Sequence, residues 1–354
     1  MDHIMKEKGI TSMTQSQLHS LRTFIEAGVT SLLRPIRAFL TKEVAGLCAR
    51  ALALMSMCVL LGSALMAQGT PMAFAVQAKP VTAWSYYVNS SSTSTAYTLG
   101  CNQGKSDKTY HQNSAAFLDF GGQLSNGSGT LLLNGSTISN GHIEAVAEAM
   151  AHGYWVCTGS DSTTVLRIGI GTNNSYYDVS YGGGQTWSNV VTAAENSIKI
   201  SGYSSQVIMY GANDIEPSWS SASAAIAWAN GFGSVGGHHY FNYGSADGCP
   251  QYSTGNGGCN NGWNQYDVYY VSWGANPAQG TPEIYYSSQA RQWAMIDLYA
   301  HQTQGGMYIE GPLDEHDLNT STFTAQGAWN ALWTDLYNAR ISQNFPYSLE
   351  VHRE

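Results

Sequence analysis

Two carboxylic acids end the apolar segment 207–219, VIMYGANDIEPSW, with one residue between them. Side chains alternate across a β-strand, so Asp214 and Glu216 are expected to project from the same face. Two acids held side by side repel each other, which raises the pKa of one and keeps it protonated near neutral pH. Such a proton donor beside a second carboxyl group suits general acid–base chemistry. The alternative is an ordinary strand end, where Pro217 and the polar residues after it start the next helix.

A third acid, Asp119, lies near the end of another expected strand. Cleavage of a glycosidic bond needs a proton donor for the leaving oxygen and a group that manages the positively charged transition state. Glu216, the longer and later acid of the pair, is the expected general acid, and Asp214 is expected to orient or stabilise. Asp119 is the next catalytic candidate. More acids follow in adjoining loops, at Asp247, Asp314, Glu315 and Asp317.

Aromatic side chains lie near the same expected strand ends. A sugar ring presents a C–H face that stacks on an aromatic plane. We therefore expect a substrate-binding set of four aromatic residues and two further acids, namely Trp219, Tyr243, Trp273, Trp293, Asp297 and Glu310. Trp273 and Trp293 are the two expected to face the substrate, and packing in the core is the alternative for each aromatic residue.

The elements that position these residues are short apolar runs alternating with helical patterns. Strands are expected at 115–121, 164–171, 206–214, 238–244, 267–274, 292–300 and 306–311, with an eighth at 130–134 or within 79–100. Helices are expected at 142–153, 187–201 and 220–232, the last capped by Ser220 or Ser221. Strands that alternate with helices predict parallel βαβ units.

This pattern predicts an α/β fold of the (β/α)8 TIM-barrel type over residues 115–354. Active sites of such barrels lie at the carboxyl ends of the strands, where the following loops converge. Helical patterns are weak after the fifth expected strand, which predicts an irregular second half.

The amino-terminal part is typical of an export signal. Residues 1–50 carry seven Lys or Arg, and residues 51–67 carry no charge. Small residues at 73–75 and 76–78 fit signal cleavage, so residues 1–78 are expected to be removed; a retained membrane anchor is the alternative. Residues 79–114 are expected to be a polar linker or an irregular opening segment.

The remainder is acidic and holds an even number of cysteines. Residues 79–354 contain 8 Lys or Arg and 20 Asp or Glu, a surface that repels phosphate backbones and argues against nucleic-acid binding. In an oxidising compartment we expect Cys249 to pair with Cys259 across a short loop, and Cys101 to pair with Cys157 by elimination; free buried thiols are the alternative. No cysteine or histidine cluster has metal-site spacing, so neither a metal nor a cofactor is expected.

Three segments resemble those of a known family. VIMYGANDIEPSW resembles the Asp-x-Glu strand of glycoside-hydrolase-type barrels, especially the family 25 lysozyme-like muramidases and related uncharacterised domains. FLDFG, at 117–121, is similar to their opening strand, and 292–319 resembles their late Gln-Trp followed by a closing Asp-x-Asn. The likeness spans 117–333. Their opening Asp-Val-Ser is absent from the first expected strand and occurs instead at 178–180, and the Asp-x-Glu strand comes early in the count.

The resemblance implies a secreted, cell-surface-associated protein that cleaves or binds peptidoglycan or another amino-sugar polymer. Glu216 matches the family's acid and Asp214 its partner. A polysaccharide or cell-wall glycan is thus the expected partner, nucleic acid is not, and a membrane is expected only if the apolar segment is retained. The alternative is a noncatalytic carbohydrate-binding or cell-surface structural barrel.

Overall fold

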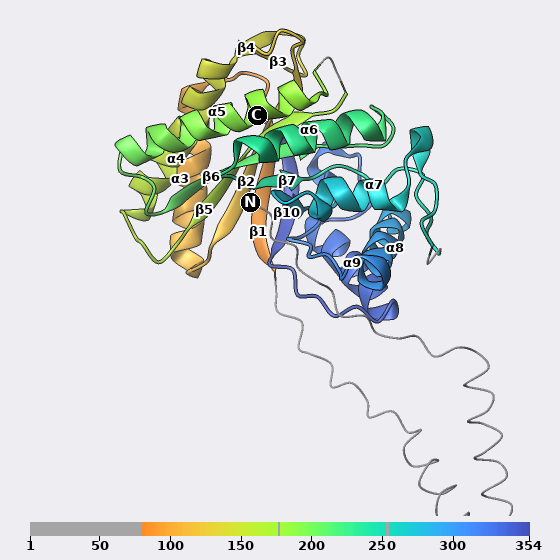
Figure 1. Ribbon diagram of the computed structural model, residues 1–354. Coiled ribbons are helices and arrows are strands. Elements are labelled where there is room, and N and C mark those ends of the chain that lie inside the picture. Colours follow the sequence, from red (N-terminus) through yellow and green to blue (C-terminus); the bar gives the residue numbers. More distant parts are fainter. Residues whose placement is uncertain (1–79, 176–177, 253–254) are drawn as a thin grey trace, which may run out of the picture. The chain divides into compact units, whose positions relative to one another are not determined.

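The computed structural model describes residues 80–175, 178–252 and 255–354. These residues form a curled sheet whose main strands are parallel (Figure 1). Within these residues the sheet has eight parallel strands: β1 (Val81–Tyr87), β2 (Ser114–Gln123), β5 (Leu166–Asn173), β6 (Val207–Asp214), β7 (Tyr240–Asn242), β8 (Ala278–Gly280), β9 (Leu313–Asp314) and β10 (Tyr347–Arg353). Their spatial order is β8-β7-β6-β5-β2-β1-β10-β9, so the last strand lies beside the first. The sheet is an α/β half-barrel.

The two edge strands, β8 and β9, are not joined by a ladder. Single parallel bridges connect Gly280 with Ile309 and Glu283 with Leu313. The sheet is therefore compatible with a TIM-like barrel but is not closed.

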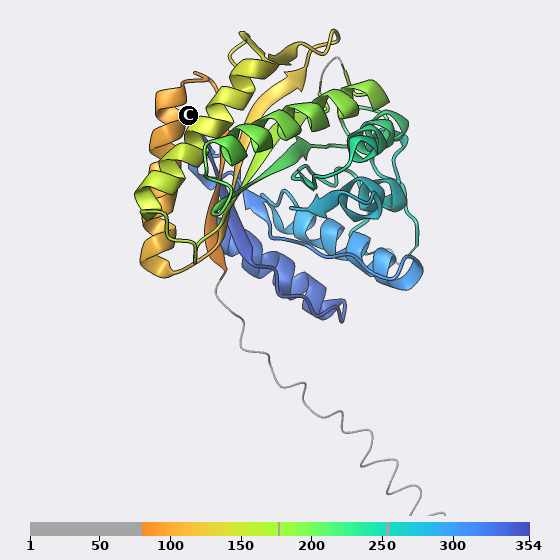
Figure 2. The same cartoon turned by 60° about the vertical axis from the view of Figure 1, so that its left-hand side comes forward.

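Helices cover the outside of the sheet (Figures 1 and 2). In chain order they are α3 (Thr93–Tyr110), α4 (Asn140–Thr158), α5 (Tyr181–Ile200), α6 (Ala222–Val235), α7 (Gln265–Tyr269), α8 (Ser287–Thr303) and α9 (Ala325–Asn338). Side chains of Ser139, Ser180 and Ser221 accept hydrogen bonds from the first turns of α4, α5 and α6, which satisfies backbone N–H groups that have no partner inside the helix. Short turns are η2 (Asn260–Gly262), η3 (Tyr270–Gly274) and η4 (His316–Leu318).

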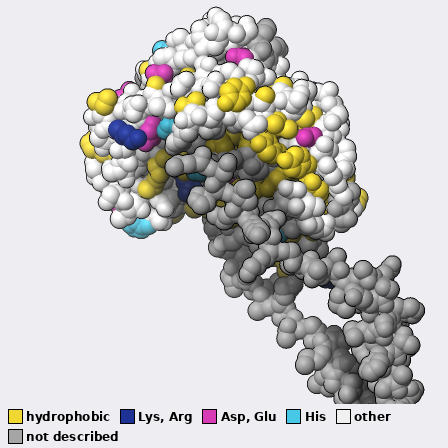
Figure 3. Space-filling view, viewed as in Figure 1, with side chains coloured by type: hydrophobic (Ala, Val, Ile, Leu, Met, Phe, Trp, Pro, Cys, Tyr) yellow, Lys and Arg dark blue, Asp and Glu magenta, His cyan; other side chains and the backbone are white. Residues whose placement is uncertain are grey.

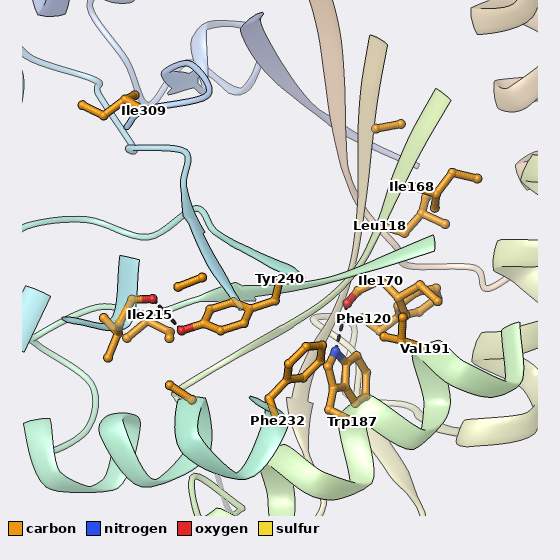
Figure 4. Close-up of a cluster of buried hydrophobic side chains, with 14 of the residues drawn as sticks. Leu118, Phe120, Ile168, Ile170, Trp187, Val191, Ile215, Phe232, Tyr240 and Ile309 are labelled. Carbon is orange, nitrogen blue, oxygen red and sulfur yellow. Dashed lines mark hydrogen bonds between the residues drawn. The ribbon is translucent and has the colours of Figure 1, made fainter. Parts of the chain in front are cut away.

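Apolar side chains fill the space between the sheet and the helices (Figure 4). Trp187 of α5 is fully buried there, and its Nε1 donates a hydrogen bond to the Ile170 carbonyl at 2.9 Å. A second cluster lies on the inner face of the curled sheet, where the rings of Phe117 and Phe241 are 4.8 Å apart. The two clusters fix the strand ends that carry the acids.

Four expected strands are confirmed as β2, β5, β6 and β7, and three are wrong. Residues 267–274 form α7 and η3, residues 292–300 lie within α8, and residues 306–311 contribute only the bridge at Ile309. In α8 the buried residues Ala290, Trp293, Asp297 and Ala300 recur at helical spacing. The density of large apolar residues at 292–300 concealed this period.

Residues 79–114 are not a linker, because 81–87 form β1, between β2 and β10, and 93–110 form α3. The eighth parallel strand thus lies within 79–100. Residues 129–131 form β3 (Gly129–Leu131), which pairs antiparallel with β2 and with β4 (Thr137–Ser139). Helix α3 has no apolar stripe; it packs closely on α4, where a Cβ on Gly100 would lie 1.9 Å from the Met150 carbonyl oxygen.

Both expected disulfides are present. Cys101–Cys157 joins α3 to α4, and Cys249–Cys259 closes the loop after β7. On the face shown in Figure 3, neutral side chains predominate over charged ones. Within the described ranges no helix combines the length and apolar character needed to cross a membrane. The expected export signal, 1–78, lies outside the described residues.

Candidate active site

Acidic side chains gather on the carboxyl side of the sheet, and the strands that carry them are not paired with one another. Asp119 is the sixth of the ten residues of β2 and lies opposite Tyr87, the last residue of β1. Asp214 is the last residue of β6, and Glu216 follows two positions later. Glu283 follows β8, and Glu315 follows β9. The sheet therefore brings together the three predicted catalytic acids and two more from distant parts of the chain.

Three of these acids are close neighbours. Carboxyl oxygens of Asp214, Glu216 and Glu283 lie within 4.8 Å of one another, and the side chains of Glu216 and Glu283 are hydrogen-bonded. Oxygen atoms this close share either protons or a hard cation such as Mg²⁺ or Ca²⁺. A direct hydrogen bond between two carboxyl groups requires a proton on one of them.

Side chains of neighbouring residues fix the backbone of Glu216 by hydrogen bonds. The side chain of Asn174 accepts a hydrogen bond from the Glu216 N–H at 2.9 Å and donates one to the Glu216 carbonyl at 3.0 Å. Asn242, at the end of β7, accepts from the N–H of Ile215 at 3.2 Å. The Asp-x-Glu segment is thus fixed by amide side chains from both neighbouring strands.

Glu283 is also fixed by its surroundings. Its N–H donates to the Gly244 carbonyl at 3.1 Å, and the Leu313 N–H donates to the Pro282 carbonyl at 2.7 Å. The side chain is only 6% exposed. Sequence reasoning missed Glu283 because segment 276–290 has no strand or helix pattern, and the only sequence signal was an acid after a proline.

Asp119 is buried beneath Asp214, Glu216 and Glu283 and is only 1% exposed. Its Oδ1 accepts a hydrogen bond from the Gly121 N–H at 2.7 Å, its carboxyl group lies within hydrogen-bonding reach of Tyr243, and its Oδ2 has no partner. Burial raises the pKa of Asp119 to about 6 against the lowering effect of these donors. At neutral pH Asp119 is therefore mostly ionised.

Burial and mutual repulsion raise the pKa values of the other acids. Burial, then the charges of Glu216, Glu283 and other acids, hold the pKa of Asp214 well above its usual range. Burial raises the pKa of Glu216 to about 7, against a hydrogen bond from Glu283 that lowers it. Burial and the charge of Glu216 raise the pKa of Glu283 strongly. Asp214 and Glu283 therefore remain protonated at neutral pH.

Tyrosines surround the acids. The Tyr87 hydroxyl donates to Glu315 Oε1, and Tyr285 is hydrogen-bonded to Glu283. The Tyr243 hydroxyl lies 3.1 Å from the Thr172 carbonyl as well as close to Asp119. Of the predicted substrate-binding residues, Tyr243 is therefore in the site, although it is buried.

Trp219 lies three residues after Glu216, and its backbone N–H donates a hydrogen bond to the Glu216 carbonyl at 3.2 Å. Its side chain is 41% exposed. Among the predicted sugar-binding tryptophans, Trp219 is thus the one that follows the acidic strand end and remains open to solvent.

The other predicted binding residues lie elsewhere. Trp293 and Asp297 lie in α8, buried in the helix-covered core, and Asp297 accepts hydrogen bonds from His301 at 2.8 Å and from Gln343. Both positions were predicted from a strand that is a helix. These two residues therefore do not project from a strand end.

Trp273 and Glu310 lie toward the amino ends of the strands. Glu310 pairs with Arg167, the second residue of β5, at 3.4 Å. Trp273, in η3, lies with its ring 6.3 Å from that of Tyr308 and lines a cavity of about 400 Å³ with His239. Both are remote from the carboxyl ends.

Neither a protein-family model nor a curated protein sequence matches the chain.

Proposed function

We propose that this protein is an exported glycoside hydrolase with a (β/α)8-type barrel, acting on peptidoglycan or another amino-sugar polymer. The observation that carries the proposal is the position of Glu216. Its carboxyl group has a pKa raised to about 7, adjoins Asp214 and lies at the carboxyl end of a parallel strand. A proton donor poised near neutral pH is what protonation of a glycosidic oxygen requires.

The fold supports the proposal. Eight parallel strands follow one another around the sheet, β10 returns beside β1, and single bridges link the chain near β8 with the chain near β9. Catalytic groups of (β/α)8 barrels come from several strand ends. Here β6 and β2 supply predicted acids, and Trp219 offers an exposed ring for a sugar.

Each acid then has a separate role. Glu216 donates its proton to the leaving oxygen as the glycosidic bond breaks, and it recovers a proton from the water that completes hydrolysis. Asp214, which burial keeps protonated, orients Glu216. Asp119, mostly ionised at neutral pH, supplies negative charge from beneath the other acids, which favours the positively charged oxocarbenium-like sugar.

Replacement of Glu216 by Gln tests this assignment. Gln has the same shape but cannot donate a carboxyl proton, so we expect release of reducing ends from peptidoglycan to fall at least about 100-fold, while co-sedimentation with the polymer persists. Glu144→Gln on α4 is the matched control and should retain activity. Wild-type activity in the Glu216→Gln protein would overturn the catalytic role.

A noncatalytic carbohydrate-binding barrel is the second candidate. It is favoured by the low exposure of Asp119 and Asp214, which are 1% and 5% exposed. In that case wild type and Glu216→Gln would bind the polymer equally and neither would release reducing ends.

A further inference from the structure

The contact between Glu216 and Glu283 joins two segments that lie far apart in the chain. Glu216 follows β6, whereas Glu283 follows β8 and is bound through its backbone to Gly244 and, through the neighbouring Pro282, to Leu313. Backbone hydrogen bonds fix both segments, so the fold itself places the two carboxyl groups side by side.

The direction of this hydrogen bond follows from the burial of each partner. Glu283 is 6% exposed, whereas Glu216 is only partly buried. Burial penalises the charged form of a carboxyl group, so the more deeply buried acid keeps the proton. Glu283 is therefore the protonated donor, Glu216 is the acceptor, and Tyr285 in turn donates to Glu283.

We propose that Glu283 is a positioning residue of this site: it keeps its own proton and donates a hydrogen bond to the Glu216 carboxylate each time Glu216 has released a proton. Its catalytic meaning rests on the proposed function. When Glu216 protonates the leaving oxygen, the carboxylate left behind is stabilised by the Glu283 O–H. A proton from water then restores Glu216, and Glu283 is neither consumed nor ionised.

The remaining groups facing the pair explain why a donor is needed. Charges on Asp247 and Glu315 raise the pKa of Glu216, and charges on Glu216 and Glu315 raise that of Glu283. A carboxyl oxygen of Asp214 lies within 4.8 Å of both acids. All of these neighbours are acidic and none is a cation, so a neutral hydrogen-bond donor is what stabilises the Glu216 carboxylate. Without Glu283 the Glu216 carboxylate would be less stable, and Glu216 would give up its proton less readily.

Two neutral variants of similar size separate this role from simple packing. Glu283→Gln keeps an N–H donor toward Glu216, whereas Glu283→Met fills the space without one. The ionisation midpoint of Glu216 can be followed by carbon NMR of labelled carboxyl groups. We expect the Gln variant to stay within about 0.5 pH unit of wild type, and the Met variant to rise by about 1–2 units, the size of one hydrogen bond to a charged group.

Hydrolysis over the same pH range supplies the second readout, since the alkaline limb of the profile should move with the NMR midpoint. Equal midpoints in the Gln and Met variants would overturn the proposal. So would a midpoint in wild type that moves on removal of divalent ions with EDTA and returns with Mg²⁺ or Ca²⁺, because an ion would then join the acids. A shifted midpoint without hydrolysis would refute the proposed function and leave the role of Glu283 toward Glu216 intact.

Discussion

Glu216 determines the pH dependence that we expect of this protein. The group acts as an acid only while protonated, and burial raises its pKa to about 7. Hydrolysis should therefore fall as pH rises through about 7, by about tenfold per unit above it. Measurement of kcat/KM between pH 5 and 9 tests this, and a rate that stays level from pH 6 to 9 would contradict it.

Asp214 should make the fold less stable as pH rises. Its folded-state pKa lies above the unfolded value of about 3.9, so the folded chain holds the extra proton and stability is lost as pH rises from that value. Asp214→Asn removes this titration with little change of shape. We expect its melting temperature to exceed that of wild type by a few degrees at pH 8, at about 2–4 °C per kcal/mol, and to match it at pH 4. An equal difference at both pH values would show that ionisation is not the cause.

The sequence predicts part of this site and misses part of it. Asp214 and Glu216 lie together because they are two residues apart where β6 ends, and alternation of extended residues is a local rule. Glu283 meets them only through strand order, which no local pattern reveals. Trp293 and Asp297 were misplaced for a local reason, since their apolar run was interpreted as a strand and is a helix.

Among the elements, β5 has a glycine, Gly171, where the Tyr243 side chain packs closely against the inner face of the sheet. A Cβ on Gly171 would lie 2.8 Å from the Tyr243 hydroxyl and 2.9 Å from the Leu118 carbonyl oxygen. Gly171→Ala should therefore displace Tyr243 from Asp119 and cost about 1–3 kcal/mol of unfolding free energy. Denaturant unfolding measures the cost.

Gly141→Ala in α4 is the control, because no atom outside its own helical turn lies within 4 Å of the added Cβ. It should be neutral or slightly stabilising, since Ala is a better helix former than Gly. A Gly171→Ala protein as stable as this control would show that the contact around Tyr243 is not tight.

Elements with strong periodic patterns are the ones predicted correctly. β2, β5, β6 and β7 follow apolar runs, and α4, α5 and α6 have serine caps. Helix α3 was missed because it buries small and polar residues such as Gly100 and Gln103. β7 has three residues, YFN, but lies in a longer apolar run, whereas β8, AQG, and the two-residue β9 have no such run around them.

At the scale of the whole molecule, β1 and α3 are part of the fold. β1 pairs with β2 on one side and β10 on the other, and α3 is joined to α4 by Cys101–Cys157. A chain of residues 79–354 should therefore fold cooperatively, whereas residues 115–354 should not. Near-ultraviolet circular dichroism and thermal unfolding distinguish the two, and a cooperative transition in the shorter chain would contradict the assignment.

The pairing of β1 with β10 also dictates when folding can finish. Val81 is in register with Tyr347, and Tyr87 with Arg353. During synthesis β1 therefore lacks this neighbour until the residues up to β10 have been made. Contacts this distant in sequence form slowly, so the sheet is completed late. Until then one edge of β1 has unpaired backbone groups that can pair with another strand.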